Sequence, residues 1–154
     1  MEPPYKLFTS KEQLLRIDTM RVIYFIIFVL SFILTEIGRY AYRPFIYRNA
    51  INDFGLADSM GNLGGIIAQI FFGLTLLNSN FKQGFSVIGF CTIGFIIYEF
   101  LQPILPKGFF DWKDVVGTFV GGLFSCLIFL LVQFIFKSTS HEKRVTLDLK
   151  PSKK

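Results

Sequence analysis

The sequence is poor in the residues that build disulfide frameworks, metal sites and soluble surfaces. It has two cysteines and one histidine in 154 residues, and charged residues make up only 18% of it. Two cysteines exclude a disulfide scaffold. The single histidine, His141, lies in the C-terminal tail, so a histidine-based metal site or a catalytic triad has no support. Phosphate-binding glycine loops and metalloprotease motifs are also missing, and we expect no cofactor and no metal ion.

Apolar residues are what the chain has in excess. The set AVILMFWYC makes up 52% of it, phenylalanine contributes 20 residues, and the mean hydropathy is +0.51. Such hydrophobicity excludes a disordered chain. A soluble domain of this size has too little interior to bury so many large apolar side chains. The composition therefore favours an integral membrane protein.

Four long apolar segments predict an all-α, polytopic membrane protein with four transmembrane helices, because about 20 apolar residues cross a bilayer. No signal-peptide cleavage pattern follows the first segment, so we expect it to stay in the mature protein. A polar segment, 1–19, precedes the membrane domain at 20–136, and a basic tail, 137–154, follows it. We expect this tail to be mostly disordered. The predicted spans are about 20–37, 59–77, 84–101 and 115–136.

The connection over 38–57 is long for a link between adjacent helices. It combines arginines with aromatic residues, which the headgroup layer of a membrane accepts. Pro44 is suited to the first turn of a short helix that ends before Gly55. We therefore predict a short interfacial helix in this segment.

The basic residues are unevenly divided between the two sides of such a protein. Four spans place both termini and the 78–83 loop on one side. The positive-inside rule therefore predicts cytoplasmic termini. The positive net charge is then explained by basic residues on the cytoplasmic side, which are attracted to anionic lipid. We therefore expect membrane lipids, and no nucleic acid, as partners. Only five basic residues fall on the outer side, namely Arg39, Arg43, Arg48, Lys107 and Lys113.

Acidic and amide residues gather near the outer ends of the spans. Glu36 and Glu99 lie inside the apolar boundary, where an ionisable group usually faces the bundle interior or a wet cavity. We therefore predict an outward-facing polar pocket. For Glu36 and Arg39, one turn apart, a simple ion pair is an equally good explanation. The candidate ligand-binding residues are Glu99, Gln102, Asp111, Asp114, Asp58, Asn62, Glu36, Arg39, Arg43 and Arg48.

Two structural roles compete with ligand binding for some of these residues. The carboxylates can pair with the outer basic residues and tie the loops down. Asp58, Asp111 and Asp114 can also stabilise the first turns of the spans that they precede.

Two short motifs lie at the outer ends of the third and fourth predicted spans. Glu99 and Gln102 form a Glu-x-x-Gln motif, and Asp111 and Asp114 form an aromatic-Asp-x-x-Asp motif before a glycine-bearing span. Over about 50–136 this pattern resembles the VanZ-like family of small bacterial membrane proteins. The resemblance implies a multi-pass protein of the bacterial plasma membrane, in a setting of cell-envelope stress or antibiotic resistance against teicoplanin-type glycopeptides.

The chain departs from the family pattern in three places. An arginine that the family has before the Asp-x-x-Asp motif is absent, with Lys107 and Gly108 nearby. Thr118 and Asn62 stand where the family usually has Asn and often has His. A shared chemistry is therefore not carried over, and function has to be argued from the site.

Three functions remain open. We favour a non-enzymatic protein whose pocket binds a lipid headgroup or an amphiphile, such as a lipophilic glycopeptide or a cell-wall precursor, with arginines on phosphate. The second is a membrane enzyme that acts on a lipid-linked or cell-wall substrate through paired carboxylates. The third is a subunit or scaffold that oligomerises through small residues such as Gly117 and Gly121. Open space between two carboxylates would favour the enzyme, and an outward-facing glycine stripe would favour the scaffold.

Overall fold

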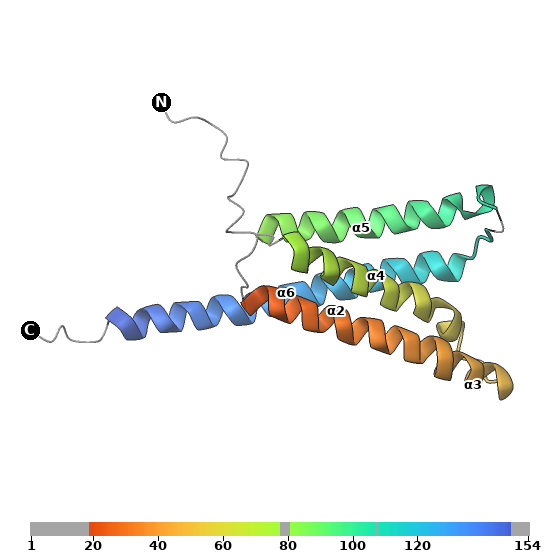
Figure 1. Ribbon diagram of the computed structural model, residues 1–154, viewed down its shortest axis with the longest axis horizontal. Coiled ribbons are helices and arrows are strands. Elements are labelled where there is room, and N and C mark those ends of the chain that lie inside the picture. Colours follow the sequence, from red (N-terminus) through yellow and green to blue (C-terminus); the bar gives the residue numbers. More distant parts are fainter. Residues whose placement is uncertain (1–18, 78–80, 107, 149–154) are drawn as a thin grey trace, which may run out of the picture.

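The computed structural model describes residues 19–77, 81–106 and 108–148, with side chains as far as 136. Within these residues the chain is helical apart from short connections, and it has no strand. Four helices are long and apolar enough to cross a membrane, which confirms the prediction of an all-α chain with four candidate spans (Figure 1). The long helices are α2 (Thr19–Ile37), α4 (Leu56–Leu77), α5 (Phe81–Leu101) and α6 (Trp112–Asp148).

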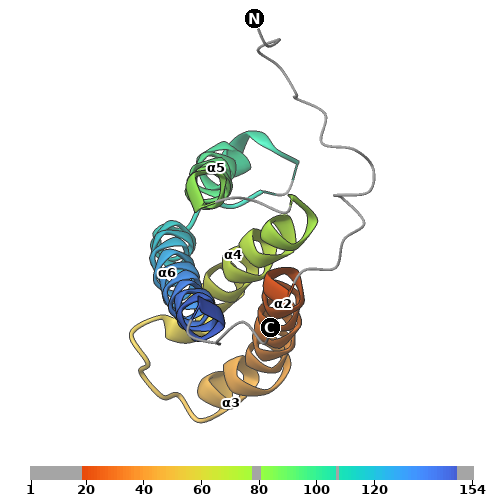
Figure 2. The same ribbon diagram turned by 90° about the vertical axis from the view of Figure 1, so that its left-hand side faces the viewer.

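Helix α4 is the centre of the bundle. It packs against α2 on one face and against α6 on another, and α5 packs on α6 and α4 (Figure 2). The core therefore consists mainly of α4 side chains, including Ile66, Ile70 and Phe71, together with Phe129 of α6. Helix α2 leans chiefly on α4, and its span is the least buried of the four.

Glycines bring α6 into backbone contact with α4. A Cβ atom at Gly117 would lie 2.8 Å from the Ser59 carbonyl oxygen. At Gly121 it would lie 2.5 Å from the Leu63 carbonyl oxygen. Any larger residue would separate the helices, which is the role of small residues in membrane bundles. The glycine stripe therefore packs inside the chain and does not supply the outward-facing surface that would have favoured the scaffold hypothesis.

The first span is longer than predicted. Helix α2 runs through a π-helical turn, η1 (Gly38–Tyr42), into α3 (Arg43–Arg48), as one continuous helix. Pro44 explains the wide turn, because proline lacks an N–H group and crowds the carbonyl four residues back. Within the turn, the backbone N–H of Arg43 donates to the carbonyl of Gly38. Residues 38–48 thus continue the helix of the first span, and an interfacial position for part of the segment 38–57 stays a prediction.

Helix α6 is longer than the fourth predicted span, although its part that is apolar enough to cross a membrane, Trp112–Phe136, ends at the predicted residue. Helix α6 continues past Phe136 to Asp148 and projects from the bundle (Figure 1). The expected disorder of the tail is therefore wrong as far as Asp148, and 149–154 lie outside the described residues, as does the N-terminal segment 1–18. Helix α2 begins at the end of the bundle where α6 leaves it (Figure 1). Which side of a membrane this end faces stays a prediction.

Candidate functional site

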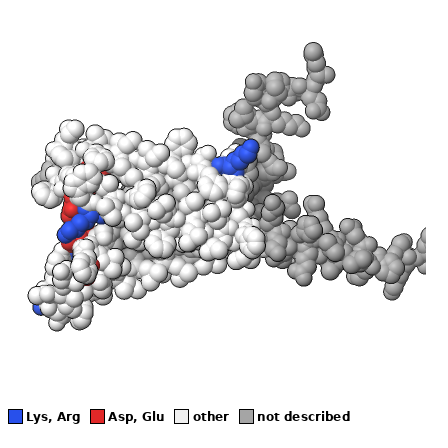
Figure 3. All heavy atoms as spheres, turned by 180° about the vertical axis from the view of Figure 1, so that it is seen from behind, with Lys and Arg blue, Asp and Glu red and all other residues white. Residues whose placement is uncertain are grey.

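Acidic and basic side chains gather at the end of the bundle opposite to the one where α6 leaves (Figure 3). They form two groups that differ in burial. We call the exposed group the Asp58 cluster; it consists of Arg43, Tyr47, Asp58 and Lys113. We call the buried group the Glu99 cluster; it consists of Asn62, Glu99 and Gln102.

Asp58 joins the ends of three helices. It lies in the first turn of α4, and its Oδ1 atom is 3.3 Å from Nη2 of Arg43 in α3. Its Oδ2 atom is 2.8 Å from Nζ of Lys113 in α6. The Tyr47 hydroxyl donates a hydrogen bond to the same carboxylate, and the Arg43 guanidinium lies 5.5 Å from the centre of the Tyr47 ring. Two cations thus share one carboxylate, and both cationic side chains are about half exposed, at 48% and 49%.

The side chains of Asp53 and Asp111, and not that of Asp58, accept the free backbone N–H groups at the starts of α4 and α6. The Asp53 side chain accepts two backbone N–H groups of the next four residues, at 2.6 and 3.1 Å, and the Tyr42 hydroxyl donates to it at 3.3 Å. Asp53 is therefore the cap of α4, so the N-cap role considered for Asp58 is wrong. Asp111 begins α6, because its side chain accepts the backbone N–H of Lys113 at 2.9 Å.

Glu99 is buried at the end of α5, with only 2% of its surface exposed. The Asn62 side-chain amide donates to its Oε1 atom at 3.2 Å, and the Gln102 side-chain amide donates to its Oε2 atom. Both partners are neutral, so they satisfy the carboxylate oxygens without balancing their charge. Asp114 of α6 is close enough for its charge to act on Glu99. The structure thus brings these four predicted site residues together, while their part in binding stays a prediction.

Apart from Asp114, four of the predicted site residues lie outside both clusters, namely Asp111 at the start of α6, Glu36, Arg39 and Arg48. Glu36 and Arg39 form an ion pair with each other at 3.6 Å. They line a groove of about 490 Å³ on one flank of the α2–α4 contact, together with Gln69. Arg48, at the end of α3, is exposed, and no ion pair of its side chain occurs among the described residues.

Tyr47 is a site residue that the sequence analysis missed. It follows Arg43 by four residues, so both lie on one face of a helix. The spacing of Arg43 and Tyr47 predicts a shared site only if residues 43–48 are taken as a helix whose Arg43–Tyr47 face lies against Asp58.

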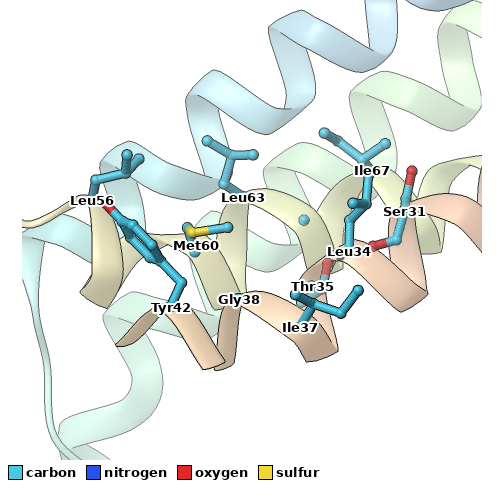
Figure 4. Close-up of a pocket in the computed structure, with 11 residues that line it drawn as sticks. Ser31, Leu34, Thr35, Ile37, Gly38, Tyr42, Leu56, Met60, Leu63 and Ile67 are labelled. Carbon is cyan, nitrogen blue, oxygen red and sulfur yellow. Dashed lines mark hydrogen bonds between the residues drawn. The ribbon is translucent and has the colours of Figure 1, made fainter. Parts of the chain in front are cut away.

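An apolar pocket of about 510 Å³ lies on the other flank of the α2–α4 contact (Figure 4). Helix α2 contributes Leu34 and Ile37 to its wall, and α4 contributes Met60 and Leu63. One end of the pocket reaches Tyr42, the residue before Arg43 of the Asp58 cluster. The pocket therefore has a long apolar wall, and one of its lining residues is next in sequence to a member of the Asp58 cluster.

Comparisons with protein-family models, with curated proteins and with solved structures find no match. Function therefore rests on the chemistry of the site. The Asp58 cluster has one more positive than negative group and suits an anion. The Glu99 cluster has the opposite balance. Among the described residues no group of three or more His, Cys, Asp or Glu side chains is placed to hold a metal ion.

Proposed function

We propose that this chain is a membrane-embedded binding protein for an anionic amphiphile. The hydrocarbon chain of the amphiphile enters the pocket between α2 and α4, and its head group lies at the Asp58 cluster. The observation that carries the proposal is the apolar pocket between α2 and α4 (Figure 4), one of whose lining residues, Tyr42, directly precedes Arg43 of the Asp58 cluster. A VanZ-like role at the outer face of a bacterial plasma membrane, toward a lipophilic glycopeptide or a cell-wall precursor, is part of this proposal.

The wall of the pocket fits a hydrocarbon chain. A volume of about 510 Å³ lies within the usual range of small-molecule pockets. Leu34 and Ile37 are 62% and 53% exposed, so the α2 side of the pocket is open toward the flank that a span presents to lipid. Transfer of a chain from bilayer to pocket gains packing but little hydrophobic free energy. Selectivity therefore has to come from the head group.

The Asp58 cluster provides a place for an anionic head group. Asp58 engages one nitrogen of the Arg43 guanidinium, and the remaining N–H donors of that group are available to a further acceptor. Guanidinium donors match the geometry of phosphate and carboxylate. Lys113, held by the same carboxylate at 2.8 Å, adds a second positive charge.

The same geometry gives less support to the enzymatic alternative. General acid–base catalysis needs carboxylates within reach of a substrate. Glu99 is 2% exposed, with both oxygens hydrogen-bonded, and Asp58 is held by two cations. Carboxylates paired with cations favour binding or structure over catalysis.

Lipid retention by the purified protein tests the proposal. The full chain is reconstituted with equal amounts of phosphatidylglycerol and phosphatidylcholine, extracted in mild detergent, and examined by native mass spectrometry. We expect retained phosphatidylglycerol in the wild type and a strong loss in Leu34→Trp, whose indole fills the pocket. Ile33→Trp is the matched control, because Ile33 is also exposed, at 47%, but does not line the pocket. Equal retention by the two variants would refute the proposed chain site.

A variant of the head-group site separates the two halves of the proposal. Arg43→Gln removes the charge and keeps a hydrogen-bonding side chain. We expect it to retain lipid but to lose the preference for phosphatidylglycerol over phosphatidylcholine. An unchanged preference would remove the Asp58 cluster from the binding site.

A further inference from the structure

Gln69 is a polar side chain on the exposed surface of a candidate span. It lies well inside α4, about 12 Å from the nearer end of that helix by helical rise, and it is exposed. The amides of Asn62 and Gln133 donate hydrogen bonds to Glu99 and Tyr24, at 3.2 and 3.0 Å. The Gln69 amide has no hydrogen-bond partner among the described residues. An amide left unpaired in hydrocarbon is costly, so this one calls for a partner from outside the chain.

Gln69 lies in the groove of about 490 Å³ between α2 and α4, on the flank opposite to the apolar pocket. Helix α4 lines this groove with Gly61 and Gly65, and nothing lies within 4 Å of a Cβ atom at Gly65. Helix α2 lines it with Phe28 and Phe32. The groove therefore leaves the backbone of α4 open to a close approach from the membrane, with an amide beside it.

The ion pair of Glu36 and Arg39 lines one end of the same groove. Nη2 of Arg39 lies 4.0 Å from the position of a Cβ atom at Gly61, which places the pair at the level of that glycine. The two charged groups are 3.6 Å apart, and their side chains are 30% and 55% exposed. Each group therefore keeps donors or acceptors for a second partner.

The polar groups of this groove are complementary to themselves. Two copies of one chain enter a membrane in the same orientation, so a twofold axis along the membrane normal joins residues of equal depth. An amide both donates and accepts, so Gln69 is suited to the partner's Gln69. Glu36 and Arg39 lie one helical turn apart, so the acid of each copy can meet the base of the other.

We propose that this groove is the interface of a homodimer. In it the two Gln69 amides bond each other, and Glu36 of each copy pairs with the partner's Arg39. A lipid chain in the groove has no polar atom at the depth of Gln69 and leaves the amide unpaired. A second copy supplies an amide and both charges at the required depths by symmetry alone.

Sedimentation equilibrium of the purified full chain in density-matched detergent tests the proposal, with the ratio of protein to detergent varied. We expect a reversible dimer. Gln69→Leu keeps the approximate size and removes the amide, and we expect dimerisation about tenfold weaker, which corresponds to about 1.4 kcal/mol. A wild type that stays monomeric at every ratio, or a Gln69→Leu variant that dimerises as the wild type does, would overturn the proposal.

A matched pair of glycine substitutions locates the interface. Gly65→Leu fills the groove, and we expect a folded monomer. Gly94→Leu is the control, because nothing lies within 4 Å of a Cβ atom at Gly94 of α5 either, but this residue does not line the groove. We expect it to dimerise as the wild type does. Equal dimerisation by the two variants would refute the proposed face.

A charge exchange tests the pairing between copies. Glu36→Arg and Arg39→Glu each give like charges at the interface, so we expect each variant alone to dimerise poorly. When the two variants are mixed, one of them labelled with a heavy isotope, we expect mixed dimers to predominate in native mass spectrometry. A statistical distribution of pairs would show that Glu36 and Arg39 do not meet across an interface, and would contradict the proposed dimer.

The same measurements reveal another occupant of the groove. A wild-type chain that stays monomeric and retains a lipid that Gly65→Leu loses would show that lipid fills the groove, and would overturn the dimer. The lipid proposed above lies on the other flank of the α2–α4 contact, and its test uses Leu34→Trp and Arg43→Gln. The two proposals can therefore fail separately.

Discussion

The two faces of α4 differ in how far along the helix the close packing extends. Toward α6, glycines bring the backbones together at Gly117 and Gly121, and any added Cβ atom would collide with a carbonyl oxygen of α4. Toward α2, the helices touch at Gly64 and Thr35, and a pocket lies on each flank of that contact. Close packing therefore fixes the frame of α4, α5 and α6, whereas the α2 face keeps space for a ligand.

The polar side chains follow the same division. On the close-packed side, the Glu99 cluster is buried and its hydrogen bonds are hard to replace. On the α2 side, the Asp58 cluster is half exposed and ties α3 to the bundle through ion pairs that water can substitute. The frame should therefore be sensitive to substitution, and the α2 side should tolerate it while losing ligand.

The largest effect is expected where the α4–α6 contact is broken. Gly121→Leu places a side chain against the backbone of Leu63, where a Cβ atom alone would lie 2.5 Å from the carbonyl oxygen. Overpacking costs about 1–3 kcal/mol and more where backbone has to move, so we expect loss of the folded protein in size-exclusion chromatography. The matched change is Gly65→Leu, because nothing lies within 4 Å of a Cβ atom at Gly65. Equal damage from both changes would erase the contrast between the two faces.

An intermediate effect is expected within the Glu99 cluster. Asn62→Leu keeps the approximate size and removes the amide that donates to Glu99 at 3.2 Å. A buried acceptor left without its partner costs about 1–3 kcal/mol, and more when it is charged. We expect a clear fall of the Tm in detergent. The double variant Asn62→Leu with Glu99→Leu should be more stable than Asn62→Leu alone, because no carboxylate is then left unsatisfied; further loss would contradict this account.

The smallest effect on stability is expected at the Asp58 cluster. Asp58→Asn weakens two ion pairs that water can reach, and such pairs contribute about 0.2–1 kcal/mol. We expect a Tm close to that of the wild type and a still smaller difference in high salt, where exposed charges are screened. A loss as large as that of Asn62→Leu, measured in the same detergent and salt, would show that the cluster belongs to the frame.

Much of the frame follows from the sequence. Apolar segments of bilayer length predict the four long helices. The Gly117–Gly121 spacing predicts a close helix–helix contact, and the structure shows that its partner is α4 of the same chain. The sequence places the end of the first span too early, at residue 37, because Glu36, Arg39 and Pro44 all indicate the end of a membrane-spanning helix. The helix continues beyond these residues by way of the π-helical turn η1, and no short sequence motif predicts such a turn.

The candidate site was predictable in part. Glu99 was expected to be buried near Asn62 and Gln102, because carboxylates inside an apolar boundary need partners. Glu36 was expected in the same pocket, but an ion pair with Arg39 on its own helix is available one turn away. The apolar pocket could not be predicted, since it depends on how α2 and α4 diverge around the contact at Gly64, and this is a property of packing and not of composition.

Photocrosslinking with an acyl-chain probe tests the central claim most directly. The full chain is placed in vesicles that contain phosphatidylglycerol with a photoactivatable acyl chain, and the crosslinked residues are identified by mass spectrometry. The account predicts labelling of Met60 and Leu63, which are only partly exposed but line the pocket. Labelling that follows surface exposure alone, with Phe90 at 79% exposed marked and Met60 and Leu63 untouched, would contradict a ligand chain between α2 and α4.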